Sequence, residues 1–409
     1  MNIPPDTQDL LKILIISDVY FPRINGVSTS IQTFALELLR LGHKVTLIAP
    51  DYAQTHEEPF EVIRIPARTV PMDREDRLMS YRAIKHMTPF LKQHQFDLIH
   101  IQTPFVAHYA GIYLGKALGI KTIETYHTFF EEYLDKYIPM LPSSLLHFIA
   151  RRFSCRQCNA VDALVSPSNA MLQVLRNYGV TTPAQVIPTG IRLEQFSQGD
   201  GTSFRERFGI PESQPLLLFV GRVALEKNIQ FLIEVMAEVV KQIPDAMLLI
   251  TGEGPARETL QNRVNSIGLS NNIRFIGYLD RDGELENCYC AADLFIFASR
   301  TETQGLVLLE AMTLGTPVVS TAVMGTGDVL EDGQGCIVAQ EELNDFSSKV
   351  VYLLKDEKKR HDLSVSAQSY AEKWSAPVMA QKMADLYRLT SVECNDIELE
   401  SRPAPSMEL

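Results

Sequence analysis

Short apolar runs alternate with amphipathic stretches along most of the chain, and loops rich in glycine, proline or asparagine separate them. Residues 12–17 form the first apolar run and predict a buried strand, which a loop at residues 18–25 follows. A helix is predicted next, since Ile31, Phe34 and Leu38 recur at helical spacing before Gly42. Because this strand–loop–helix unit repeats, the pattern predicts parallel sheets that helices cover on both faces.

The repeats fall into two series. The first has further strands at residues 45–49, 62–65, 98–102, 121–124, 163–167 and 185–188. The second has strands at residues 216–220, 247–251, 273–276, 294–298, 318–321 and 336–338. Between them, residues 196–215 are rich in Ser, Gly, Asp and Pro, which predicts a linker and hinge. We therefore expect an α/β protein with doubly wound domains at residues 1–195 and 216–375, and a disordered polar tail at residues 391–409.

Composition and charge narrow the function classes. The chain has 409 residues, of which 45% are hydrophobic, so it is long enough for two folded domains. Its 38 basic and 50 acidic residues give a net charge of −12, which disfavours a protein that coats nucleic acid. The apolar runs are far shorter than the roughly 20 residues of a spanning helix. The first residues lack the pattern of an export signal, so we expect a cytoplasmic protein with free thiols.

Two basic residues follow the first strand of the second series. Arg222 and Lys227 lie five residues apart in the loop after residues 216–220. A guanidinium and an ammonium group that converge beside a helix N-terminus can bind a pyrophosphate. The spacing alone is equally compatible with two solvated loop charges.

Two carboxylates follow the strand predicted at residues 294–298. Glu302 precedes a predicted helix and Glu310 lies about two turns along it, so the pair is too far apart for acid–base chemistry. Their separation suits hydroxyls at opposite ends of an elongated ligand, while the N–H groups from Gly305 to Val307 would meet a phosphate. Taken alone, the pattern is more typical of a helix-start acid and an ordinary exposed glutamate.

Two more candidates lie in the first series. His127 follows the strand at residues 121–124, where an imidazole can donate to a sugar hydroxyl or transfer a proton. Gly26 lies after the first strand, where a residue without a side chain permits close approach of the backbone to a diphosphate. For each residue alone, a structural histidine and an ordinary turn glycine are the more common explanations.

Together these motifs resemble the retaining, nucleotide-sugar-dependent glycosyltransferases of family 4, over nearly the whole chain. The resemblance is carried by Asn25-Gly26-Val27, Tyr126-His127-Thr128, Ser166-Pro167-Ser168, Ile187-Pro188-Thr189-Gly190, Gly221-Arg222 with Lys227-Asn228, Gly252-Glu253-Gly254-Pro255, and Glu302 with Glu310. Residues 127–133 and 302–307 look most like the branch that glucosylates diacylglycerol. The resemblance implies the GT-B architecture, with two facing Rossmann-like domains and a C-terminal helix, here residues 376–390, that returns to the first.

The resemblance also implies how the second domain binds a nucleoside diphosphate sugar. Arg222 and Lys227 would bind the donor diphosphate and offset charge on the departing nucleotide. Glu302 would hydrogen-bond to the donor sugar, with the N–H groups of Gly305 and Leu306 near the distal phosphate.

The remaining roles follow from the same resemblance. Glu310 would bind the ribose, Gly26 would let the first loop approach the phosphates, and His127 would contact the donor sugar near the reacting centre. Many members have a Gly-Gly-Glu sequence after the strand at residues 318–321. This chain has Gly325-Thr326-Gly327-Asp328 there, which leaves the contacts of that loop open.

The resemblance implies transfer of a hexose with retention of configuration, and it favours glucose from UDP-glucose as the donor and a lipid such as diacylglycerol as the acceptor. Residues 1–195 would form the domain on the acceptor side. No cofactor or metal is expected, since the chain lacks an Asp-x-Asp pair at a strand end and the Arg–Lys pair can stabilise the leaving charge. The alternatives are a mannosyl- or other hexosyltransferase acting on a glycan, polyprenyl or soluble sugar or sugar-phosphate acceptor, and a nucleotide-sugar epimerase of similar architecture.

A basic segment bears on the acceptor. Residues 139–156 combine apolar side chains with Arg151, Arg152 and Arg156. A helix of this kind can lie on an anionic membrane surface, here the inner face. It is equally typical of an amphipathic helix that packs on its own sheet.

Overall fold

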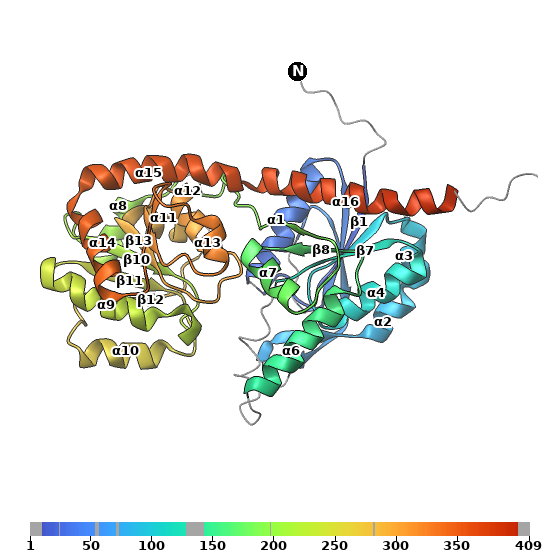
Figure 1. Ribbon diagram of the computed structural model, residues 1–409, viewed down its shortest axis with the longest axis horizontal. Coiled ribbons are helices and arrows are strands. Elements are labelled where there is room, and N and C mark those ends of the chain that lie inside the picture. The colour runs from blue at the N-terminus through green and yellow to red at the C-terminus, as the bar shows by residue number, and fades with distance from the viewer. Residues whose placement is uncertain are drawn as a thin grey trace, which may run out of the picture. The chain divides into compact units, whose positions relative to one another are not determined.

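The computed structural model describes residues 10–23, 25–53, 57–70, 73–127, 143–196, 198–280 and 283–399. The chain divides into two compact units (Figure 1). Unit 1 comprises Met1–Gly190 and Ala376–Leu409, and unit 2 comprises Ile191–Ser375. Unit 2 is therefore inserted between the two parts of unit 1.

In the described part of unit 1, the main sheet has seven strands, and every neighbouring pair is parallel. Its order is β3-β2-β1-β6-β7-β8-β9. The strands are β1 (Lys12–Ile16), β2 (Lys44–Pro50), β3 (Glu61–Ile65), β6 (Leu98–Ile101), β7 (Lys121–Thr125), β8 (Ala163–Ser166) and β9 (Ala184–Val186). Each lies at a predicted run. The sequence missed a small antiparallel sheet of β4 (Ala67–Val70) and β5 (Asp73–Met79), because β5 begins with charged residues rather than an apolar run.

Helices connect most of these strands, and one further helix, α16 (Ala376–Leu399), returns to unit 1 after unit 2. The connecting helices are α1 (Gly26–Arg40), α2 (Tyr81–His86), α3 (Thr88–His94), α4 (Val106–Leu118), α6 (Ser143–Cys158) and α7 (Asn169–Asn177). The start of α1 is fixed by Asn25, whose side chain accepts a hydrogen bond from the N–H of Ser28. Helix α16 lies beside α1 (Figure 1).

Helix α16 corrects the expectation of a disordered tail from residue 391. The helix runs to Leu399, and residues 400–409 lie outside the described part. Its continuation is explained by the sequence, since residues 391–399 contain no proline or glycine and Pro403 is the next helix breaker.

Unit 2 has a second parallel sheet, with the order β12-β11-β10-β13-β14-β15. Its strands are β10 (Leu216–Val220), β11 (Met247–Thr251), β12 (Ile273–Gly277), β13 (Leu294–Phe297), β14 (Val318–Ser320) and β15 (Cys336–Val338). The flanking helices are α8 (Gly201–Phe208), α9 (Ile229–Gln242), α10 (Arg257–Ser266), α11 (Glu284–Ala291), α12 (Leu306–Thr313), α13 (Gly325–Val329), α14 (Leu343–Lys355) and α15 (Glu357–Ala371), with 3₁₀ turns η2 (Leu225–Lys227) and η3 (Glu372–Trp374).

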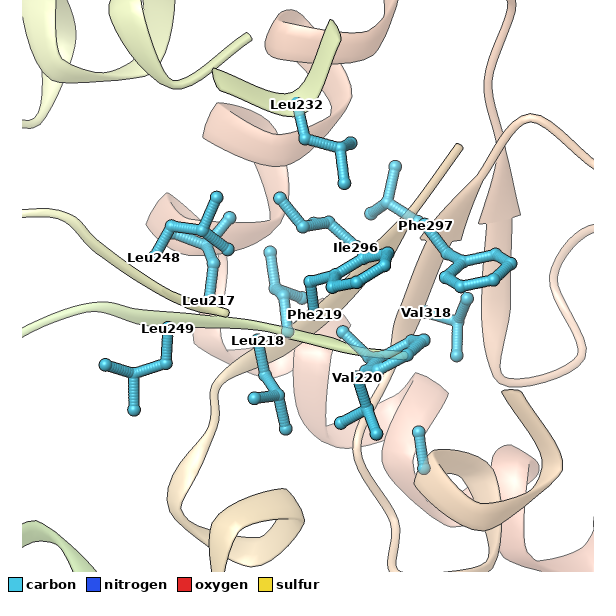
Figure 2. Close-up of a cluster of buried hydrophobic side chains, with 14 of the residues drawn as sticks. Leu217, Leu218, Phe219, Val220, Leu232, Leu248, Leu249, Ile296, Phe297 and Val318 are labelled. Carbon is cyan, nitrogen blue, oxygen red and sulfur yellow. The ribbon is translucent and has the colours of Figure 1, made fainter. Parts of the chain in front are cut away.

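The core of unit 2 lies on both faces of this sheet. Figure 2 shows side chains of β10 together with Leu248 and Leu249 of β11, Ile296 and Phe297 of β13, and Leu232 of α9. Every residue of β10 and β11 is buried. Each fully buried Leu or Phe side chain contributes about 1.5–3 kcal/mol, which is why these central strands read as unbroken apolar runs.

The prediction that residues 196–215 form a linker is wrong. It contains α8, which Asp200 caps at its start and Gly209 ends in the left-handed conformation. Phe196, Phe204 and Ile210 are buried in the core of unit 2. The unit boundary instead falls at Gly190–Ile191, where the N–H of Ile191 donates to the carbonyl of Trp374 at 2.8 Å.

In both sheets the strand order reverses at one point, between β1 and β6 in unit 1 and between β10 and β13 in unit 2. Loops leave these neighbouring strands toward opposite faces of the sheet. The carboxyl ends of such strands are where ligands bind in open parallel sheets. The loops of Gly26, Lys227 and Glu302 follow strands at these reversal points, whereas His127 follows β7, one strand further from the reversal point of unit 1.

Helix α6 covers the described part of the basic segment; residues 139–142 lie outside it. Leu146, Ala150 and Ser154 are buried along one side, and the Ser154 hydroxyl lies 3.0 Å from that of Tyr126. Phe148 is 63% exposed on the other side. Internal packing is thus confirmed for one face only. Within the described residues, no helix has both the length and the apolar content needed to span a bilayer.

Candidate active site

The reversal point of unit 2 brings two predicted residues into contact. Lys227 lies after β10 and Glu302 lies after β13, and their side chains form an ion pair. The exposed fractions are 19% for Lys227 and 18% for Glu302, so water screens the pair less than it screens surface pairs. Arg222, in the same loop as Lys227, is exposed. The Lys227–Glu302 contact confirms that the two loops meet.

Backbone contacts hold the loop of Lys227. The N–H of Val223 donates to the carbonyl of Glu253 at 2.9 Å, which joins this loop to the one after β11. A Cβ on Gly252 would lie 2.0 Å from the carbonyl oxygen of Gly221. The Gly-Glu-Gly motif therefore lets two loops pack closely, and Lys227 extends from a fixed turn.

The loop after β14 supports Glu302. The N–H of Gly325 donates to the Glu302 carbonyl at 2.9 Å, and a Cβ on Gly325 would lie 2.1 Å from the carbonyl oxygen of Thr303. Only glycine fits there. The loop whose contacts the sequence left open thus holds the backbone of Glu302.

Helix α12 starts where a phosphate was expected. Gly305 is its N-cap in the left-handed conformation, with φ of 89°, and Leu306 is its first residue. The first N–H groups of a helix have no acceptor within it and carry partial positive charge. Gly305 and Leu306 therefore stand where the helix start can receive an anion.

Glu310 differs from the simple expectation of an exposed glutamate. It is 4% exposed, and one carboxylate oxygen accepts a hydrogen bond of 2.8 Å from the hydroxyl of Tyr289 on α11. Tyr289 is itself fully buried. No local sequence pattern indicates this tyrosine, because its role depends on the contact between α11 and α12.

The predicted residues of unit 1 follow β1 and β7. Gly26 opens α1 and is exposed, and a Cβ built on it would meet no described atom within 4 Å. The fold itself therefore does not require glycine at this position. Gly26 leaves space at the start of α1 that a ligand can enter.

His127 follows β7 and contacts a residue that the sequence analysis did not select. Its Nε2 lies 2.8 Å from Oε1 of Gln102, which follows β6. Burial lowers the pKa of His127 to about 4. The imidazole is therefore neutral near pH 7.

A second histidine, which lies within the sheet, interacts electrostatically with His127. His100 on β6 is buried, with Nδ1 2.6 Å from the hydroxyl of Tyr387 on α16 and Nε2 2.7 Å from that of Thr125. Burial, with a smaller effect of His127, lowers the pKa of His100 to about 3. This pair of contacts joins α16 to the two strands that carry the site.

Asp18, after β1, is another buried group that the sequence analysis did not select. Its carboxylate accepts hydrogen bonds from the hydroxyl of Thr103 at 2.8 Å and the N–H of Ala107 at 3.0 Å. Burial raises its pKa to about 6, although these donors lower it. Asp18 ties the β1 loop to the start of α4.

Comparison with known proteins supplies the family. Residues 24–195 match the family described as Glycosyltransferase Family 4, and residues 200–370 match Glycosyl transferases group 1. Over 320 residues, the chain is 34% identical to an alpha-monoglucosyldiacylglycerol synthase of Streptococcus pneumoniae, covering 76% of this chain and 71% of the relative. The chain belongs to the family 4 glycosyltransferases. It is thus a sugar-transferring enzyme, as the resemblance implied.

Further relatives cover nearly the full chain. An alpha-monoglucosyldiacylglycerol synthase of Acholeplasma laidlawii is 26% identical over 405 residues, covering 96% of this glycosyltransferase and 100% of the relative. A GDP-mannose-dependent alpha-mannosyltransferase of Mycobacterium tuberculosis is 24% identical over 397 residues, covering 92% and 96%. The sucrose-phosphate synthase structure from Thermosynechococcus elongatus matches with a TM-score of 0.75 and 21% identity, covering 94% of this chain and 100% of that one. The GT-B fold is confirmed.

Proposed function

We propose that this glycosyltransferase moves glucose from UDP-glucose to diacylglycerol or a closely related lipid, with retention of configuration. The observation that carries the proposal is the Lys227–Glu302 ion pair at the reversal point of unit 2. It places a cation suited to a diphosphate beside a carboxylate suited to sugar hydroxyls. The name shared by two relatives specifies glucose, diacylglycerol and an alpha linkage.

In this proposal unit 2 binds the donor. Arg222 and Lys227 bind the diphosphate and stabilise the charge that develops on the departing nucleotide. Glu302 accepts hydrogen bonds from the hexose, the N–H groups of Gly305 and Leu306 bind the distal phosphate, and Glu310 binds the ribose. The Lys227–Glu302 pair holds both side chains in place before the donor arrives, which lowers the ordering cost of binding.

Unit 1 supplies the remaining contacts. Gly26 allows the diphosphate to approach the start of α1, and His127 contacts the hexose near the anomeric carbon. The departing phosphate oxygen accepts the acceptor proton on the face from which the new bond forms. This assignment fits a His127 that stays neutral near pH 7.

The test compares variants that remove one charge of the pair. We expect Lys227→Ala and Glu302→Ala to lose transfer of glucose to diacylglycerol in mixed micelles while retaining the wild-type circular dichroism spectrum. Lys241→Ala is the matched control, because Lys241 forms an exposed ion pair with Glu238 on α9. Full activity in either Lys227→Ala or Glu302→Ala would contradict the assignment of the active site.

We also propose that transfer needs no metal ion. The Arg222–Lys227 pair would neutralise the leaving diphosphate in place of a divalent cation. Activity should therefore persist in EDTA. Loss of activity in EDTA with recovery on adding magnesium or manganese would contradict this proposal.

The lipid acceptor leads to a further proposal for α6. Its outer side exposes Phe148 at 63% and Ile149 at 47%, close in sequence to the exposed Arg152. We propose that this side contacts an anionic membrane surface. Phe148→Ser combined with Arg152→Ser should reduce co-sedimentation with anionic vesicles, whereas Val365→Ser, at an exposed position of α15, should not.

A mannosyl or other hexosyl donor is the second candidate, since a GDP-mannose-dependent relative covers most of the chain. Supplying UDP-glucose and GDP-mannose separately with a lipid extract, followed by mass analysis of the product, distinguishes the donors and identifies a glycan, polyprenyl or soluble acceptor. An epimerase would instead interconvert nucleotide sugars with no acceptor present.

A further inference from the structure

Gln102 is a buried polar residue with no part in the roles proposed so far. It follows β6, where its N–H donates to the carbonyl of Ile16 at 2.9 Å, and it is 4% exposed. Its Oε1 lies 2.8 Å from Nε2 of His127. The side chain therefore ends on the imidazole rather than in solvent.

The surrounding contacts repeat across the two strands. His100 lies opposite Ile123 in the β6–β7 register, but its ring bonds to Thr125, two residues further along. Gln102 bonds to His127 with the same two-residue offset. Gln102 lies one residue beyond the end of β6, and residues two apart along an extended strand, such as His100 and Gln102, point to the same side. The Gln102–His127 contact is thus the outer of two successive polar contacts that fasten β6 to β7.

We infer that Gln102 is the positioning residue of His127: its amide oxygen accepts the Nε2–H and leaves Nδ1 as the unprotonated nitrogen. An amide oxygen only accepts hydrogen bonds, so the ring must donate through Nε2. The contact fixes both the orientation of the ring and its tautomer. The geometry stands by itself, whereas the consequence for catalysis rests on the proposed function.

A neutral partner suits this position. The imidazole is partly buried, and the titratable group of β6 that interacts with it electrostatically is His100, which is held between Tyr387 and Thr125. A carboxylate at residue 102 would accept the same hydrogen bond but would favour a protonated, cationic ring. Glutamine holds the ring without charging it.

The tautomer deepens the proposed function. With Nε2–H committed to Gln102, His127 offers Nδ1 as an acceptor. The hexose must then present a hydroxyl that donates to the ring. This sharpens the sequence-based expectation, in which His127 was as able to donate to the sugar as to transfer a proton.

Nitrogen NMR of the full-length protein tests the inference without any turnover. The His127 ring signals are assigned by their loss in His127→Gln, and the shifts of protonated and unprotonated ring nitrogens are distinct. We expect Nε2 protonated and Nδ1 unprotonated from pH 6 to 8. Gln102→Leu should redistribute the proton between the two nitrogens, and Gln102→Glu should raise the pKa of His127 by about 1–3.

The matched control is Gln157→Leu, which removes a glutamine of unit 1 that is 5% exposed and donates to the carbonyl of Pro104. It should leave the His127 signals unchanged. A wild-type ring protonated at Nδ1, or a Gln102→Leu ring with the wild-type proton distribution, would overturn the inference.

Kinetics separate this inference from the proposed function. Gln102→Leu should lower kcat with little change in the acceptor KM, and Gln102→Glu should add a loss of activity on the acid side of the pH profile. If His127 has the expected tautomer but the protein transfers no glucose, only the proposed reaction is contradicted. If the protein transfers glucose but His127 has the opposite tautomer, only the positioning role of Gln102 is contradicted.

Discussion

Substituting Tyr289 by phenylalanine removes one oxygen atom from the interior of unit 2. That hydroxyl donates to the carboxylate of Glu310 at 2.8 Å, and both residues are buried. The ring can keep its tilted packing against Phe295, with centroids 5.7 Å apart. The change therefore isolates the hydrogen bond from the packing of the side chain.

The expected cost follows from the nature of the acceptor. A hydrogen bond to a charged group contributes about 1.5–3 kcal/mol, and a buried carboxylate that loses a donor bears the full effect. The free energy of unfolding of unit 2 should thus be about 1.5–3 kcal/mol lower in Tyr289→Phe than in the wild type. Urea unfolding followed by the fluorescence of Trp374 measures it, because this sole tryptophan packs against the core of unit 2.

Tyr278→Phe is the control, because it removes the same atom from a side chain that is 76% exposed. If Tyr289→Phe unfolds at the same urea concentration as this control, the hydroxyl does not stabilise the carboxylate of Glu310, which contradicts the prediction. With Glu310 bound to the ribose, as proposed, Tyr289→Phe should also raise the donor KM more than it lowers kcat. An unchanged donor KM would separate Glu310 from donor binding.

Three further outcomes follow from particular contacts. Gly26→Ala should keep the stability of the wild type, since the added Cβ would meet no described atom within 4 Å. It should weaken donor binding about tenfold in calorimetry, because the methyl group would remove one contact between the backbone and the phosphate. Gly325→Ala should cost about 1–3 kcal/mol and reduce transfer, because its Cβ collides with the backbone beside Glu302; wild-type melting and rates would refute this. Burial lowers the pKa of His100 to about 3, so its contribution to stability is lost as pH falls from 6.5 toward 3. In His100→Gln, the free energy of unfolding should therefore change with pH less steeply than in the wild type, by about 1.4 kcal/mol per pH unit. Urea unfolding followed by circular dichroism measures this slope, and the fluorescence of Trp374, which reports unit 2, is the control. An unchanged slope would contradict the assignment.

The central strands were predictable because they are buried on both faces. Strands β10 and β11 have the predicted boundaries, since a strand covered on both sides is an unbroken apolar run. Helix α8 was missed although Asp200 and Gly209 are ordinary helix-boundary residues. Its polar outer face resembled a linker, and only the burial of Phe204 in the core distinguishes the two.

The site was predictable in its residue types but not in its contacts. Glu302 and Lys227 are 75 residues apart, and only the strand order of unit 2 brings them together. Tyr289 and Gln102 carried no local signal, because each acts on a residue of another element. Spacing also could not show that Glu310 is buried, since helical position alone does not reveal which neighbour covers a side chain.

The hydrogen bond between Ile191 and Trp374 has a consequence for how such enzymes diversify. It places the entry and exit of unit 2 side by side, so the whole unit forms a cassette with adjacent ends. Recombination can exchange a cassette of this kind with a relative's through two junctions that lie at one place. If unit 2 selects the donor, as proposed, such an exchange would change the sugar while the unit that meets the acceptor is inherited unaltered.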